Sequence, residues 1–174
     1  MRALAPLLLA ATSWCQPAST PPDGDGAAAA ASPQQGAPLP EANRGDPLQA
    51  TIPLYGEGIV ELSDLRGRVV VLDFFSPAES AWVSEHMHWR SLRAANLESI
   101  EIVAVATGST DTALVDHWDS EPPEHVVAWD PQGALVLRLG VESLPTIVVL
   151  DRLGRVVASG SDRAALRRTA ASLL

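Results

Sequence analysis

Cysteine is almost missing from this chain. The sequence holds a single one, Cys15, and residues 16–174 contain none. Dithiol exchange needs one thiolate to attack and a second thiol to resolve the mixed disulfide, and an intramolecular disulfide needs two cysteines. Residues 16–174 therefore cannot carry out dithiol exchange with cysteines of their own.

Basic charge is also scarce. The chain has no lysine, and twelve arginines stand against 21 acidic residues, for a net charge of −9. Residues 51–174 alone carry seventeen acidic residues and ten arginines, with no basic stripe that could neutralise phosphates. A nucleic-acid partner is excluded on this ground.

The acidic residues gather in one stretch, residues 111–130, which contains no arginine. A face of this kind could repel like-charged surfaces or attract a basic partner, but a charge run is usually a solvated face, and that is the interpretation we favour. The six acids are Asp111, Asp116, Asp119, Glu121, Glu124 and Asp130.

The N-terminus lacks an apolar run long enough to span a bilayer. Arg2 precedes nine mostly apolar residues, which is typical of an export signal. Residues 1–15 are predicted to be a signal peptide of lipoprotein type, because Cys15 stands where a bacterial lipoprotein would carry its lipid-modified cysteine. Thr12 and Trp14 depart from the usual pattern, so simple cleavage near Ala11 and an unprocessed N-terminus stay open. The expected location is the bacterial cell envelope or periplasm, with membrane contact only through the lipid anchor.

One domain follows a linker. The first fifty residues hold eight of the fourteen prolines and show no apolar periodicity, so residues 16–50 are predicted to be a disordered linker. From residue 51 the chain is dense in Val, Leu and Ile, and residues 51–174 are long enough for a single core.

A buried strand and the helix after it organise this domain. Residues 69–75 read Val-Val-Val-Leu-Asp-Phe-Phe, and so little polar alternation predicts a strand covered on both faces. Glu79 or Ser80 would complement the N-terminus of the following helix. On that helix, Trp89 is expected in the core, and Trp82 is expected to fill or cover a surface groove.

The remaining pattern alternates strands and helices, which predicts an α/β fold with a central mixed sheet, flanking helices and an N-terminal hairpin. The C-terminal helix is expected to carry its arginines toward the end where the dipole favours them. The expected elements are a hairpin over 52–62, strands at 98–106, 126–129, 147–151 and 155–159, and helices at 110–118, 134–139 and 162–174.

Two motifs resemble the thioredoxin superfamily, most closely the exported thioredoxin-like thiol-disulfide oxidoreductases of redoxin type. Asp73-Phe74-Phe75 is similar to the strand end that leads into Cys-x-x-Cys, and Leu144-Pro145-Thr146 is similar to the Val-Pro-Thr loop that faces it. The resemblance implies a thioredoxin-like fold and a cis peptide bond before Pro145. Aligned without gaps, the two cysteine positions fall on Glu79 and Trp82.

The resemblance therefore implies a pseudoenzyme whose redox site is lost. The degenerate site and its groove would consist of Asp73, Glu79, Ser80, Ala81, Trp82, Leu144 and Pro145. In thioredoxins the acid at the Asp73 position serves the cysteines; here we expect it to end a strand and reach water or backbone donors. The leading hypothesis is a non-catalytic binding or scaffold module with a protein partner.

Three alternatives stay open. One is a thiol-disulfide oxidoreductase-related role in cell redox homeostasis that uses a partner's cysteines. A second is an activity using Asp73, Glu79 and a histidine, and a third is a haem or copper carrier. No cofactor and no metal are predicted, because His86 and His88 point to nearly opposite sides of a helix, and His117 and His125 add no matching spacing.

Overall fold

The computed structural model describes residues 45–77, 82–108 and 125–174, with the backbone alone for residues 82–88. Its elements in chain order are β1 (Thr51–Pro53), β2 (Ile59–Glu61), the 3-10 helix η2 (Leu62–Leu65), β3 (Val69–Phe75), α1 (Trp82–Ala95), β4 (Ile100–Thr107), β5 (Val126–Asp130), α3 (Ala134–Leu139), β6 (Thr146–Leu150), β7 (Val156–Gly160) and α4 (Arg163–Ser172).

The strands form a hairpin and a five-stranded mixed sheet. In the hairpin, β1 and β2 pair antiparallel, with Ile52 opposite Val60. The main sheet has the order β5-β4-β3-β6-β7. β3 pairs parallel with β4, and β4 with β5, whereas β6 pairs antiparallel with both β3 and β7. The α/β class, the mixed sheet and the N-terminal hairpin predicted from the sequence are confirmed.

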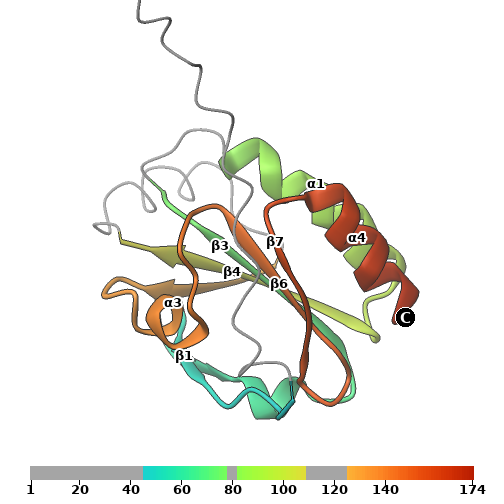
Figure 1. The fold of residues 1–174 in the computed structure, drawn as a ribbon, viewed down its shortest axis with the longest axis horizontal. Helices are drawn as coiled ribbons and strands as arrows, with labels where there is room; N and C mark the ends of the chain where they lie inside the picture. The colour runs from blue at the N-terminus through green and yellow to red at the C-terminus, as the bar shows by residue number, and fades with distance from the viewer. Residues whose placement is uncertain (1–44, 78–81, 109–124) are drawn as a thin grey trace, which may run out of the picture. The chain divides into compact units, whose positions relative to one another are not determined.

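β3 lies at the centre of this sheet and is buried along its whole length. Alternation along the strand directs Val71 to one face, where it packs with Trp89 of α1 and Leu166 of α4. Leu72 points to the other face, toward Leu135 of α3. Figure 1 shows the same division, with α1 and α4 on one side of the sheet and α3 with the hairpin on the other. Trp89 is 1% exposed, so its predicted place in the core is confirmed.

Most element predictions agree with the structure, but one feature of α4 does not. The strand over residues 69–75 and the helix over residues 134–139 have the predicted bounds, whereas the helix expected at residues 110–118 lies outside the described residues. The arginines of α4 were expected toward its C-terminal end. That prediction is wrong, because the helix begins with Arg163 and its last turn contains no basic residue.

Candidate functional site

The structure describes part of the candidate site. Asp73, Leu144 and Pro145 are described in full, and Trp82 opens α1 with only its backbone described. Glu79, Ser80 and Ala81 lie outside the described residues, as does Cys15.

The register of the sheet brings the two resembling motifs to the same edge. Thr146 of β6 pairs with Phe74 of β3, so the residue before Thr146 lies level with the end of β3. The Leu144–Pro145 peptide bond is cis, as the resemblance implies. Both side chains are partly exposed, while Thr146 is buried and its hydroxyl donates to the carbonyl of Ser143 at 2.7 Å. A partly buried hydrogen bond thus holds the loop next to the strand end.

Asp73 lies just below this edge. It is level with Ala104 of β4 and Ile147 of β6, and its side chain is 1% exposed. This carboxyl was expected to reach water or backbone donors, and its burial excludes contact with bulk solvent. Alternation along β3 directs it to the face that α1 and α4 cover, where ionised oxygen atoms need a compensating charge or donor.

That charge comes from Arg163, the first residue of α4. Its Nη2 atom lies 3.7 Å from Oδ1 of Asp73, and its side chain is 16% exposed. The geometry follows from the strand order: Asp73 is level with Ile147, Ile147 is level with Gly160, and α4 begins three residues after Gly160. Three neighbouring strands thus bring together two residues that are ninety positions apart in the sequence.

Sequence reasoning missed Arg163, although a signal for it exists. Asp162 caps α4, with its side chain accepting from the N–H of Ala165 at 3.0 Å. An arginine directly after the cap lies at the positive end of the helix dipole, which disfavours it locally. A residue placed against local preference suggests a tertiary partner, and here that partner is Asp73.

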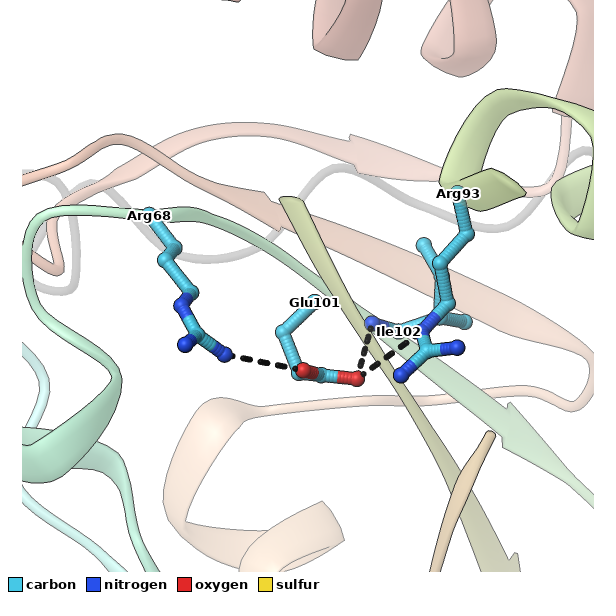
Figure 2. A network of polar contacts seen from close by, with 4 residues as sticks. All are labelled: Arg68, Arg93, Glu101 and Ile102. Carbon is cyan, nitrogen blue, oxygen red and sulfur yellow. Dashed lines mark hydrogen bonds and ion pairs between the residues drawn. The ribbon is translucent and has the colours of Figure 1, made fainter. Parts of the chain in front are cut away.

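A second buried carboxylate lies at the opposite end of β3. Glu101 of β4 is level with Val70, near the start of the strand, and its side chain is 7% exposed. Figure 2 shows its two oxygen atoms between Arg68 and Arg93, which donate at 3.2 and 3.1 Å, and the N–H of Ile102 also donates, at 3.3 Å. These contacts link the residue before β3 and the last turn of α1 to β4. Their role is structural.

The acidic stretch contains a residue that does not belong to a solvated face. Asp130 is 6% exposed, and its carboxylate accepts from the backbone N–H groups of Ala134, Leu135 and Val136 at 2.8, 2.9 and 3.2 Å. Its assignment to an acidic face was wrong, because it caps α3. The other five acids of that stretch lie outside the described residues.

Within residues 45–77, 82–108 and 125–174, no three His, Cys, Asp or Glu side chains come together as metal ligands. None of the helices described there has the length and apolar character needed to cross a bilayer.

Comparison with known proteins identifies the family. The Redoxin family model matches residues 34–171, so the chain belongs to the Redoxin family. No curated protein matches it.

Several solved structures are similar to this chain. A putative thiol:disulfide interchange protein DsbE from Chlorobium tepidum is 27% identical, with a TM-score of 0.66, over 75% of this chain and 96% of that one. A secreted Mycobacterium tuberculosis disulfide oxidoreductase is 20% identical, with a TM-score of 0.61, over 72% and 96%. The exposed lipoprotein thioredoxin of Streptococcus pneumoniae is 18% identical, with a TM-score of 0.63, over 72% and 100%. The fold is therefore thioredoxin-like, of the thiol-disulfide oxidoreductase type.

The described part of the site has the backbone features of a thioredoxin-like fold but no thiol group. The strand end, the cis-proline loop and a buried acid are present, while residues 16–174 contain no cysteine. A carboxylate paired with a guanidinium can hold charge and position neighbouring elements. It cannot supply the thiolate that attacks a disulfide.

Proposed function

We propose that this chain is a non-catalytic thioredoxin-like protein of the bacterial cell envelope that binds a protein partner through the former active-site groove. The groove would lie between residues 79–82 and the Leu144–Pro145 loop. One observation carries the proposal: the cis loop is kept at the edge where β3 ends, in a domain without cysteine. A framework without its nucleophiles can still present a surface to a polypeptide.

The location is part of the same proposal. One of the similar proteins is secreted and another is an exposed lipoprotein. The charged and apolar residues at the N-terminus, followed by Cys15, agree with export and lipid attachment. We propose that Cys15 carries the lipid and that residues 16–50 form the tether.

An insulin-reduction assay tests the absence of catalysis. The full chain, supplied with dithiothreitol, should reduce insulin no faster than dithiothreitol alone, because residues 16–174 have no thiol. A Cys15→Ser variant removes the last thiol and serves as the control. Turnover above background in that variant would overturn the proposal.

A binding experiment tests the groove. Envelope proteins captured by the wild type should be lost in a variant with Trp82→Ala and Leu144→Asp. Leu137→Asp is the matched control, since Leu137 is a leucine on α3 that is 79% exposed. Circular dichroism checks that each variant is folded. Equal recovery of the same proteins by both variants would show that the groove is not the binding surface.

The cis loop and the family membership favour one second candidate. This is a thiol-disulfide oxidoreductase-related role in which a partner supplies both cysteines and this chain only positions them. Faster refolding of a scrambled disulfide substrate by a cysteine-bearing partner, only when the Cys15→Ser chain is added, would support this candidate over a scaffold.

A further inference from the structure

The face formed by α1 and α4 differs in charge from the rest of the chain. α4 contains three arginines and no acidic residue, and the described side chains of α1, residues 89–95, include two arginines and no acid. The whole chain has a net charge of −9. The described side chains of these two helices are thus basic on an acidic protein, although Arg93 pairs with Glu101 and Arg163 with Asp73.

An open hollow of about 660 Å³ lies along α4 on this face, with Leu92 of α1 as its one lining residue from the other helix. Guanidinium groups and small apolar side chains line it together: Leu92, Arg163, Ala164, Arg167, Arg168 and Ala171. Figure 1 shows α1 and α4 lying along each other. A volume of this order accommodates a few side chains of a ligand.

The three arginines that line the hollow differ in their contacts with the rest of the domain. Arg167 donates from Nη2 to the hydroxyl of Ser91 at 2.9 Å and so connects α4 to α1. Arg163 faces Asp73, which offsets its charge. Arg168 is exposed. The net positive charge at the hollow thus comes from Arg167 and Arg168, and the apolar residues beside them are the half-buried Leu92 and the exposed Ala164 and Ala171.

We propose that this hollow binds an acidic segment of a partner protein. Guanidinium groups bind carboxylates with two parallel hydrogen bonds, and Arg167 and Arg168 supply two such groups. Small side chains between the acidic ones would pack against Leu92 and the alanines. A peptide suits this surface better than a membrane, because the arginines surround a hollow, whereas a bilayer presents a broad surface. The proposal does not depend on the former active-site groove, which lies at the edge where β3 ends.

A labelled peptide of alternating glutamate and alanine tests the proposal by fluorescence anisotropy with the full chain. We expect saturable binding that weakens as salt rises from about 0.05 M to about 0.3 M, since exposed ion pairs are screened. The variant Arg167→Gln with Arg168→Gln should bind roughly fivefold more weakly, as expected for two exposed pairs. Among the described side chains, Arg168 makes no hydrogen bond or ion pair to α1, so Arg168→Gln alone should weaken peptide binding by part of that factor and leave the stability of the domain unchanged.

The matched control is Arg138→Gln with Arg155→Gln, which removes the same charge from two exposed positions on α3 and in the β6–β7 turn. It should bind like the wild type. Equal weakening by both double variants would show that net charge alone acts, and would overturn the proposal. Absence of peptide binding also overturns it, and binding to anionic phospholipid vesicles with the same arginine dependence would then assign the face to a membrane surface.

Discussion

The two ends of β3 hold their buried carboxylates in different ways. Where the strand begins, Glu101 accepts hydrogen bonds of 3.1 to 3.3 Å from two arginines and a backbone N–H. Where it ends, Asp73 faces Arg163 at 3.7 Å, which is beyond hydrogen-bond length. The first end is fixed by short polar contacts. The second end, where relatives would carry their cysteines, combines a deeply buried acid with a longer ion pair.

This difference indicates why the fold can form without a redox-active pair of cysteines. The Glu101 end ties α1 to β3 and β4 through contacts that involve no thiol, and β3 is buried along its whole length. This framework therefore needs no cysteine, and residues 16–174 contain none. Four predictions test whether the two ends differ as described, beginning with the largest expected effect.

Restoring two cysteines at the Asp73 end should restore redox chemistry. In a Cys15→Ser background, Glu79→Cys with Trp82→Cys puts two thiols three residues apart in the sequence, the second at the first residue of α1. They should form a disulfide that dithiothreitol reduces, and the helix N-terminus should lower the first thiol's pKa below the roughly 8.5 of a free cysteine. Thiolate absorbance against pH measures this, with Glu79→Cys alone as the control. Failure of the two thiols to pair in a folded domain would refute the alignment on which the site rests.

Removing the cation at the Asp73 end should cost the most stability. Arg163→Met leaves a carboxylate that is 1% exposed without its guanidinium, so unfolding should become easier by roughly 2–3 kcal/mol, less than for a fully buried pair because Arg163 is partly exposed. Asp73→Leu in the same background should restore most of the loss. Urea denaturation measures both. A loss below about 0.5 kcal/mol in the single variant would show that the pair contributes little.

The Glu101 end should respond differently, because two arginines share one carboxylate. Arg68→Gln or Arg93→Gln alone should cost about 0.5–1 kcal/mol, since the other arginine and the N–H of Ile102 remain. The double variant should cost about 2 kcal/mol or more, because Glu101 then keeps neither cation. Strict additivity in a double-mutant cycle would contradict a shared site.

The sequence predicted what depends on local pattern. The apolar run of β3, the bounds of α3 between Gly133 and Gly140, and the core position of Trp89 follow from periodicity and turn chemistry alone. Each of these signals lies within a few residues of the element that it specifies.

What the sequence did not predict depends on strand order. Arg163 reaches Asp73 only because β6 and β7 follow β3 in the sheet, and no local pattern encodes that adjacency. Glu101 could have been suspected, since it interrupts an apolar strand between Ile100 and Ile102, but its arginine partners come from other elements. Long-range ion pairs require the topology first.

A third buried carboxylate, Asp130, tests whether a paired cation explains the different stabilisation of Glu101 and Asp73. Asp130 is 6% exposed and accepts three backbone N–H groups at the start of α3, a contact set without an arginine. Asp130→Asn keeps one acceptor oxygen but loses the second and the negative charge, so we expect a cost of about 1 kcal/mol in urea denaturation, less than that of Arg163→Met or of the Arg68 and Arg93 double variant. Asp64→Asn, in η2, is the control for loss of one negative charge. If Asp130→Asn costs as much stability as Arg163→Met, buried carboxylates in this domain are stabilised by the hydrogen bonds they accept and not by a paired cation. The two ends of β3 would then differ only in the length of those hydrogen bonds.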